Sequence, residues 1–565
     1  MTEVLTAAQM RAVEQAAIDS GEVTGLALME RAGQGVVDAI LEEWPAFNDP
    51  RVSLSTSPES SEPDKGDAFR AVVLCGPGNN GGDGFVVARL LFQLGWQLEV
   101  FLYGDPDKLP PDARVNYERW LEIGTVAPLP EGVWLPQCDL HVDALFGTGL
   151  TRPVPESISY SLSYLHKRHP PFVAVSVDLP SGLCADSGRP IGVAGKADLT
   201  VTFHKAKCGH FLAEGPARCG NVRVADIGLP APKFRSTDEL VAYVSDPARE
   251  KMTGAQLKEY HERQKAEARS LVRLIDGPVS FGMRHADRKD NDAHKYTHGH
   301  ALILSGGSGQ TGAARLAARG ALRIGAGLVT LGVPPAAQME VACQITALMM
   351  RRVEGAEGLA EALQDQRLNA LCLGPGLGLD RARALVPVAL AAQRATVLDA
   401  DALTAFGEDP DKLFDLLHPN CVLTPHGGEF ARLFPDIAEK LTSAPTVGPA
   451  YSKVDATREA ARRAGCVVLF KGPDTVIADP DGRCAINAAM YERAAPWLAT
   501  AGSGDVLAGF ITGLLARGIA PQSAAETAAW LHEECARQFG PGLIAEDLPE
   551  QLPAVLRNLL SDQKN

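Results

Sequence analysis

The sequence lacks the patterns that mark secreted, disulfide-stabilised or membrane-spanning chains. Its eleven cysteines are odd in number and form no CxxC pair, and no apolar secretory region precedes them. We therefore expect reduced thiols, mostly in hydrophobic cores, in a cytoplasmic protein. No apolar run approaches about 18 residues, the length that makes a membrane span plausible, so no membrane partner is expected.

Positive charge is also scarce. The chain has 54 Lys and Arg against 69 Asp and Glu, a net charge of -15. Such a chain repels a polyanion, which excludes a large nucleic-acid surface but leaves small anionic ligands possible at local sites. At 565 residues it exceeds what one core supports, and 45% hydrophobic residues with 55 glycines favour an α/β enzyme of two or more domains.

Short apolar runs alternate with helix-length segments in both halves of the chain. In the first half these runs begin at Ala71, Leu98, Leu140, Phe172 and Asp198. In the second half they begin near residues 300, 327, 368, 395, 421 and 467. Runs of this kind separated by helices predict parallel, doubly wound sheets.

The spacing of these runs predicts two α/β domains joined by a polar segment. We predict a first domain over 1–232, a charged linker over 233–290 and a second domain over 291–565. Ser53–Asp67 is rich in Ser, Pro and charge and is predicted to be a flexible insertion, and Leu441–Tyr451 to be a surface loop.

The most informative segment is TAGSGDVLAG, residues Thr500–Gly509, which leads into an apolar helix. Its glycines permit close approach of a ligand, and the free N–H groups and positive dipole end of the helix favour an anion. Asp505 is placed to accept a proton from a hydroxyl that attacks phosphate. The alternative is a plain glycine-rich turn in which Asp505 is the N-cap.

Two other strand ends in this half carry polar residues. Lys471 follows VVLF, and His426 follows CVLTP. A lone histidine is more often structural, and a lone lysine more often solvated. Because the carboxyl ends of strands in open α/β sheets form the ligand crevice, their shared location favours a binding site.

The motifs GGSGQTGAARLAARG, LGPGLG, DADAL, TPHGGE, KGPDT and AGSGDVLAG resemble the ribokinase-like NAD(P)H-hydrate dehydratase family from His294 onward. The resemblance implies that Asp505 helps transfer phosphate from ADP to the substrate hydroxyl, with Mg2+ on the nucleotide phosphates. It implies substrate near Ala313, Gly378, His426 and Asp505. It implies nucleotide at Lys471, Gly472, Pro473, Asp474, Thr475 and Gly504. The residues identify no Mg2+ ligand, and only the resemblance to bacterial fusion forms favours ADP over ATP.

In the first half, Gly76–Gly84 (GPGNNGGDG) follows a strand and satisfies the G-x-G-x-x-G pattern. A dinucleotide dehydrogenase with Asp105 as its ribose-binding acid is one alternative, and a structural turn is another. Asp143 and Asp178–Ser181 also follow strands, so three loops are expected to converge over one crevice.

Together with LTAAQMRAVEQAA, LMERAG and TFHKAKCGH, these loops resemble the NAD(P)H-hydrate epimerase family over residues 1 to about 230. The resemblance implies a Rossmann-like domain with Asp178 as the acid/base at the hydrated carbon. It implies substrate contacts from Asn79, Asn80, Gly81, Gly82, Asp83, Gly147, Thr148, Gly149, Leu150, Thr151, Arg152, Pro153 and Asp178. It implies K+ held by Asn80, Asp143 and Ser181, whose oxygens suit a hard cation, although such residues are commonly caps and turn formers.

The preferred hypothesis is a bifunctional enzyme that epimerises hydrated NADH and NADPH and dehydrates the S form. The alternative is a vitamin or sugar kinase fused to a nucleotide-binding module. We also expect a homo-oligomer. Zinc at His294, His298 and His300 is rejected, because no Cys or carboxylate set completes a site and Gly299 disfavours a regular helix.

Overall fold

The structure, a computed structural model, describes residues 2–48, 68–130, 136–167, 172–229, 270–277 and 294–562. The predicted insertion Ser53–Asp67 and all of the predicted linker except 270–277 lie outside these residues. The described residues divide into two compact units. The N-terminal unit holds residues 3–229 together with Ala444–Ser452, and the C-terminal unit holds the rest. None of the helices in this described part of the chain is long and apolar enough to span a membrane.

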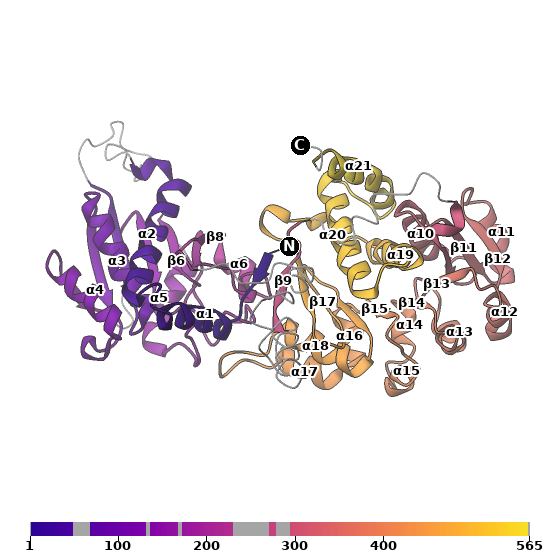
Figure 1. The fold of residues 1–565 in the computed structure, drawn as a ribbon, viewed down its shortest axis with the longest axis horizontal. Helices are drawn as coiled ribbons and strands as arrows, with labels where there is room; N and C mark the ends of the chain where they lie inside the picture. Colours follow the sequence, from indigo (N-terminus) through magenta and orange to yellow (C-terminus); the bar gives the residue numbers. More distant parts are fainter. Residues whose placement is uncertain are drawn as a thin grey trace, which may run out of the picture. The chain divides into compact units, whose positions relative to one another are not determined.

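The N-terminal unit is built on a fully parallel sheet (Figure 1), which confirms the predicted doubly wound architecture. The strand order is β4-β3-β2-β5-β6-β7-β8. The strands are β2 Arg70–Cys75, β3 Gln97–Leu102, β4 Val126–Pro128, β5 Leu140–Ala144, β6 Val173–Val177, β7 Leu199–Phe203 and β8 Asn221–Ala225. The chain leaves β2 in one direction and returns to β5 on its other side, so the ligand crevice of such a fold lies above these two strands.

Helices cover both faces of this sheet. They are α1 Ala7–Asp19, α2 Gly25–Glu43, α3 Asn79–Gln93, α4 Pro111–Leu121, α5 Glu156–Lys167 and α6 Gly215–Cys219. Val72 and Leu74 of β2 pack with Ile158 and Leu162 of α5, whereas Val73 between them faces Gly84 of α3. Alternate residues of one strand therefore contact helices on opposite faces, as the period of a strand requires.

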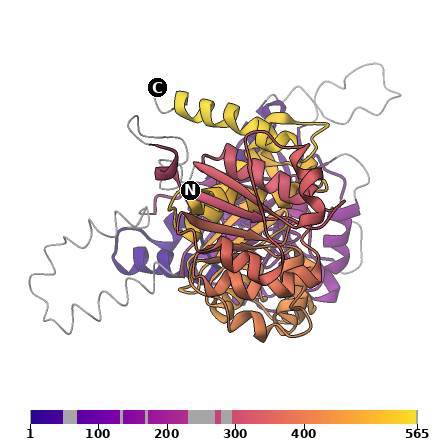
Figure 2. The ribbon, with the colours of Figure 1, turned by 90° about the vertical axis from the view of Figure 1, so that its right-hand side faces the viewer.

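The C-terminal unit contains a larger sheet, with the strand order β9-β18-β17-β16-β15-β14-β13-β10-β11-β12. Its β12 edge faces the viewer in Figure 2. The strands are β9 Val272–Leu274, β10 His300–Leu304, β11 Leu328–Val333, β12 Met349–Arg352, β13 Leu368–Leu373, β14 Ala395–Leu398, β15 Cys421–Leu423, β16 Val467–Phe470, β17 Asp474–Ala478 and β18 Cys484–Ala488. The run from β16 to β12 is parallel, and β17 is antiparallel to both of its neighbours.

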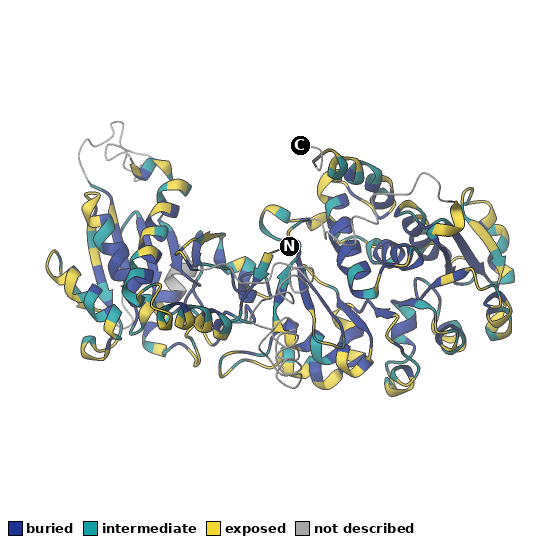
Figure 3. Cartoon of the chain, in the orientation of Figure 1, coloured by how far each residue is buried: buried dark blue, intermediate teal, exposed yellow. Residues whose placement is uncertain are grey.

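The helices of this unit include a closely packed pair, α10 and α19. The helices are α10 Gly312–Arg323, α11 Gln338–Ala342, α12 Gly355–Ala362, α13 Leu379–Ala391, α14 Asp401–Thr404, α15 Asp411–Phe414, α16 Gly427–Leu433, α17 Pro435–Thr442, α18 Lys453–Ala464, α19 Ser503–Ala516, α20 Pro521–Phe539 and α21 Asp547–Asp562. From Val506 onward α19 is buried on every side (Figure 3). A Cβ at Gly509 would lie 2.1 Å from the Ala317 carbonyl oxygen of α10, so only glycine permits this close approach of the two helices.

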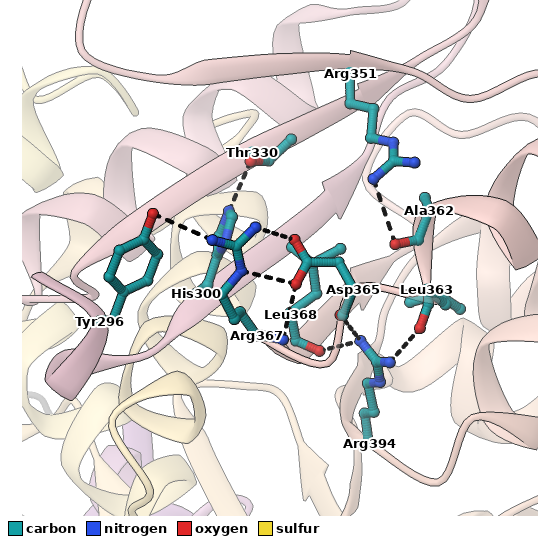
Figure 4. Close-up of polar contacts among 10 residues, drawn as sticks. All are labelled: Tyr296, His300, Thr330, Arg351, Ala362, Leu363, Asp365, Arg367, Leu368 and Arg394. Carbon is teal, nitrogen blue, oxygen red and sulfur yellow. Dashed lines mark hydrogen bonds and ion pairs between the residues drawn. The ribbon is translucent and has the colours of Figure 1, made fainter.

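At the amino ends of the parallel strands, an arginine network fixes the entry to β13 (Figure 4). Arg394 donates to the carbonyl oxygens of Leu363, Asp365 and Leu368. Arg367 forms a two-pronged ion pair with Asp365, at 2.9 and 2.8 Å, which holds the pKa of that carboxyl well below its usual range. His300, one of the three histidines considered for zinc, instead contacts Thr330 Oγ1 at 2.7 Å through its Nε2.

Candidate functional site

A cluster of charged side chains occupies the carboxyl ends of three neighbouring strands of the C-terminal unit. Asp399 follows β14, Thr424 follows β15 and Lys471 follows β16. Lys471 Nζ donates to Asp399 Oδ1 at 2.7 Å and lies 3.9 Å from Glu429 Oε2, while Thr424 Oγ1 donates to Asp399 Oδ1 at 2.9 Å. Burial disfavours the ammonium, but Asp399 and Glu429 raise the pKa of Lys471 above its usual value. Lys471 is therefore a permanent cation at this edge.

The glycine-rich segment places Asp505 in the first turn of α19. Gly502 is the N-cap, with a left-handed φ of 88°, and no side chain caps the helix. The alternative in which Asp505 itself is the N-cap is therefore wrong, because Asp505 is the third helical residue. A Cβ at Gly504 would lie 3.5 Å from Lys471 Nζ. The uncapped helix start and the lysine are thus close together, and both have the positive electrostatic character that favours an anion.

Asp505 has the electrostatic properties of a base that works near neutral pH. Burial raises its pKa to about 6, with Asp399 and Asp401 adding to the rise and Lys471 opposing it. A carboxylate with such a pKa is largely ionised at pH 7 and accepts a proton more readily than an ordinary aspartate. Asp505 makes no hydrogen bond within the described residues, so both of its oxygens are available to a ligand.

The predicted substrate residues of this unit lie around the same edge. Gly378 N donates to Asp401 Oδ2 at 2.8 Å, and Ala313 contacts the neighbouring Gly376. His426 is the N-cap of α16, and its Nδ1 accepts from Gly428 N at 3.0 Å. Its side chain is 56% exposed, so the cap leaves an imidazole edge open to a ligand.

The predicted nucleotide segment 472–475 is a tight turn at the start of β17. Thr475 Oγ1 donates to the Gly472 carbonyl oxygen at 2.7 Å. Asp474 accepts from the nearly buried Lys453 at 2.7 Å, and Lys453 Nζ lies 4.4 Å from the ring centre of Phe470. Lys453 was missed in the sequence, where it is one of many lysines. Its charge offsets that of Asp474, which would otherwise repel a phosphate.

In the N-terminal unit, Asp178 follows β6 in a strained left-handed conformation, with φ of 67°. Its Oδ1 accepts from Thr202 Oγ1 at 2.8 Å and from Lys207 Nζ at 3.0 Å, and its Oδ2 accepts from Thr148 N at 3.0 Å. Burial alone would raise the pKa of Asp178, but the charge of Lys207 lowers it below the usual value. Asp178 is thus an ionised base despite its burial.

Lys207 and His210 are functional candidates that sequence reasoning did not single out, although both lie in the TFHKAKCGH motif. Lys207 is 1% exposed and also donates to Thr202 Oγ1 at 2.7 Å. His210 Nδ1 accepts from Lys207 N at 2.9 Å, so its Nε2 is the donor to the Asp178 carbonyl oxygen at 3.0 Å. Burial lowers the pKa of His210 to about 4, and the ring is neutral.

The glycine-rich loop after β2 meets the loop after β5 at Gly147. A Cβ at this glycine would lie 2.8 Å from both Asn80 Oδ1 and Asp178 Oδ2. Asn79–Asp83 form the first turn of α3, behind the N-cap Gly78. Burial, then the charges of Asp178 and Glu14, raise the pKa of Asp83 well above its usual value. The crevice therefore holds one carboxyl whose surroundings favour the neutral form, Asp83, and one whose surroundings favour the ionised form, Asp178.

The rest of the predicted substrate loop is more open. Gly149, Thr151, Arg152 and Pro153 are exposed, and Leu150 packs beside Cys184, Ile191 and Ala450. Gly448 N donates to the Thr151 carbonyl oxygen at 2.9 Å, so the segment Ala444–Ser452 lies against this loop within the N-terminal unit. Asp105, the acid that a dehydrogenase would need, caps the short helix Pro106–Lys108 instead.

Two of the three predicted K+ residues are in direct contact. Ser181 Oγ donates to Asp143 Oδ1 at 2.6 Å, and Ser181 N donates to Asp143 Oδ2 at 2.8 Å. Asn80 lies against Gly147, in the loop that follows Asp143, and its buried Nδ2 has no partner within the described residues. These oxygen donors fit a hard monovalent cation, with an amide that is free to turn its oxygen inward.

Both halves of the chain match known families. Residues 301–554 match the NAD(P)H-hydrate dehydratase family, and residues 25–209 match the family described as YjeF-related protein N-terminus. Among solved structures, an ADP/ATP-dependent NAD(P)H-hydrate dehydratase from Bacillus subtilis, co-crystallised with ATP and Mg2+, is 27% identical. It covers 50% of this chain and 99% of its own, with a TM-score of 0.40.

Curated relatives extend this similarity along the chain. An NAD(P)H-hydrate epimerase from Rhodobacter capsulatus is 47% identical over 40% of this chain and 100% of its own. A bifunctional NAD(P)H-hydrate repair enzyme from Moorella thermoacetica is 35% identical over 98% of this chain and 97% of its own. Another, from Salinibacter ruber, is 33% identical over 98% of this chain and 96% of its own. Because this similarity runs through nearly the whole of both chains, the protein belongs to the family of bifunctional NAD(P)H-hydrate repair enzymes.

Proposed function

We propose that the chain repairs hydrated NADH and NADPH in two steps. The N-terminal unit interconverts the R and S hydrates, and the C-terminal unit dehydrates the S form with ADP, releasing AMP and phosphate. The observation that carries this proposal is that each unit places an aspartate near a lysine, the buried Asp178 with Lys207 and the partly buried Asp505 with Lys471. The relatives with both activities in one chain support the pairing.

In the dehydratase site, Asp505 takes the proton of the substrate hydroxyl. The hydroxyl oxygen then attacks the terminal phosphorus of ADP, and the bond between that phosphorus and AMP breaks. The N–H groups at the start of α19 and Lys471 bind the charge that develops on the phosphoryl oxygens. Phosphate then leaves with the electron pair of the C–O bond, and loss of a proton from the adjacent carbon restores the double bond. The original hydroxyl oxygen departs in phosphate.

The carboxylates at this edge would hold Mg2+, which would neutralise the charge of the nucleotide phosphates. The residues present fit such an ion, because the four carboxyl side chains Asp399, Asp401, Glu429 and Asp505 gather around Lys471. These four oxygen donors are the class that Mg2+ prefers.

In the epimerase site, Asp178 exchanges a proton with the hydrated carbon's hydroxyl, while the first turn of α3 and the loop Gly147–Pro153 hold the dinucleotide. K+ held by Asn80, Asp143 and Ser181 would supply positive charge beside this loop. Burial raises the pKa of Asp143, and a bound cation would keep that carboxyl ionised. Thr202 and Lys207 keep Asp178 oriented and charged.

The test incubates the full chain with separated R and S hydrates, with ADP, ATP or no nucleotide, and follows epimers and recovered cofactor by chromatography. We expect epimerisation without nucleotide and recovery of NADH or NADPH only with it, faster with ADP than with ATP. Asp505→Ala should stop dehydration and spare epimerisation, and Asp178→Ala should do the reverse. Loss of both activities in either folded variant would contradict two independent sites.

Product identity separates this proposal from a small-molecule kinase. A kinase would leave a stable phosphorylated vitamin or sugar and return no cofactor from the hydrates. We further propose a cytoplasmic homo-oligomer with the domain boundaries predicted above, which analytical ultracentrifugation and limited proteolysis test directly.

A further inference from the structure

Helix α1 is attached to the epimerase site at two points. Just before the helix, Leu5 pairs with Lys207 in an isolated β-bridge. Leu5 N donates to the Ala206 carbonyl oxygen at 3.0 Å, and Cys208 N donates to the Leu5 carbonyl oxygen at 3.2 Å. One turn into the helix, Arg11 Nη1 donates to the Thr148 carbonyl oxygen at 3.4 Å. The helix therefore crosses from the Lys207 segment to the predicted substrate loop.

Glu14 lies three residues after Arg11 and so on the same face of α1. It is half-buried and has no hydrogen bond or ion pair within the described residues. Burial and the charge of Asp178 raise its pKa, with Lys207 and Arg11 opposing the rise. The groups around it are Arg11 on its own helix, Asp83 of α3, Asp178 after β6 and Lys207 after β7. An unpartnered carboxyl in this position is not explained by packing or capping.

We propose that Glu14 is a second catalytic carboxyl of the epimerase, the proton donor that complements Asp178. This inference rests on the proposed function. Glu14 lies in the LTAAQMRAVEQAA motif, before residues 25–209 of the family match, and the sequence pattern assigns it no role. Two carboxyls whose surroundings favour opposite protonation states are suited to paired acid and base roles.

The chemistry of the substrate requires such a pair. Water adds to an enamine with its oxygen on the carbon bonded to nitrogen, so the hydrate is a hemiaminal. Asp178 takes the hydroxyl proton, the C–O bond becomes C=O, and the C–N bond breaks with its electron pair left on nitrogen, which takes the proton of Glu14. After rotation about the adjacent C–C bond, nitrogen attacks the other face, and both protons return. No oxidant, reductant or net proton is consumed.

Asp83 is the competing donor, because it too is a carboxyl whose surroundings favour the neutral form. It is 9% exposed and lies in the first turn of α3, whereas Glu14 is more open and lies on a helix that contacts the predicted substrate loop through Arg11. The greater exposure of Glu14 gives it access to the ring nitrogen of a bound hydrate, and Glu14 is therefore preferred.

The test compares Glu14→Gln, Asp83→Asn and the wild type, with the exposed Glu22→Gln as matched control. Epimerisation of purified R hydrate is measured without nucleotide between pH 5.5 and 9, after subtraction of the buffer rate. For Glu14→Gln we expect kcat to fall by about 100-fold or more with KM little changed, and the alkaline limb of the kcat profile to disappear. Glu14→Asp should restore part of the rate, and dehydration of S hydrate with ADP should be unchanged in all four.

Three results would overturn the assignment: kcat of Glu14→Gln within about threefold of wild type, a loss carried by KM alone, or an unchanged alkaline limb. If Asp83→Asn alone lowers kcat with KM little changed and loses the alkaline limb, the proton donor is Asp83 instead. If the wild type fails to exceed the buffer rate, the proposed epimerase function itself is wrong, which is a separate outcome. Circular dichroism of each variant, with the partial rescue by Glu14→Asp, distinguishes lost chemistry from lost folding.

Discussion

The pH dependence of dehydration follows from the surroundings of Asp505. Its pKa is raised to about 6, and the reaction needs its ionised form as the base. The rate at saturating substrates should therefore fall as pH falls through about 6. The ionised fraction is about 0.9 at pH 7 and about 0.09 at pH 5, so we expect a drop of roughly tenfold over this interval.

The assay follows recovery of NADH from S hydrate by absorbance, at saturating ADP and Mg2+. The terminal phosphate of ADP also titrates near this range, so a variant must identify the titrating group. Lys471 opposes the rise of the Asp505 pKa, and Lys471→Met should move the acid limb to higher pH. The nucleotide's own titration is the same for both proteins. Asp505→Asn should lower kcat by about 10²–10⁴-fold.

Two results would refute this reasoning. A rate that stays flat from pH 7 to pH 5 would mean that Asp505 is not the base. An acid limb that does not move in Lys471→Met would assign the titration to the nucleotide instead.

Three further substitutions test other parts of the structure. Lys207→Met leaves the buried carboxylate of Asp178 without its cation, which should lower the free energy of unfolding by about 3–5 kcal/mol and raise the pH needed for epimerisation. Denaturant titration measures the change in stability, and the pH–rate profile measures the change in pH dependence. Gly147→Ala adds a Cβ 2.8 Å from Asp178 Oδ2 and should lower epimerase kcat/KM at least tenfold, whereas Gly149→Ala, with nothing within 4 Å, should not. Arg394→Met removes the donor of three carbonyl oxygens and should lower the free energy of unfolding by about 2 kcal/mol without changing either kcat.

The apolar runs predicted where the buried strands lie along the chain and that they are parallel, because such strands are apolar on both faces. The edge strands were harder to predict. β12, with the sequence MMRR, and β4, only three residues long, have no apolar pattern and exist because a neighbouring strand pairs with them. β9 likewise is recognisable only through its pairing with β18.

The glycine-rich and strand-end motifs predicted which side chains would lie close together at the ends of the strands, but not which neighbours would shift their pKa values. The ionised state of Asp178 depends on Lys207, 29 positions later, and the raised pKa of Asp505 depends on burial and on Asp399. These effects arise from distances between atoms on different strands, which local sequence does not specify. The role of Glu14 likewise depends on the pairing of Leu5 with Lys207, which no periodicity in the helix predicts.

The close packing of α10 and α19 has a consequence for the energetics of ligand binding. Gly513 repeats the contact of Gly509 one turn later, with a Cβ position 2.6 Å from the Ala321 carbonyl oxygen, so α19 is held against its neighbour through backbone atoms. A helix fixed in this way presents its first N–H groups in one orientation before any ligand arrives. Phosphate binding then does not have to order the site, so less of the binding free energy is lost to ordering. Contacts with one short anionic group are therefore sufficient to hold a large, flexible nucleotide in place.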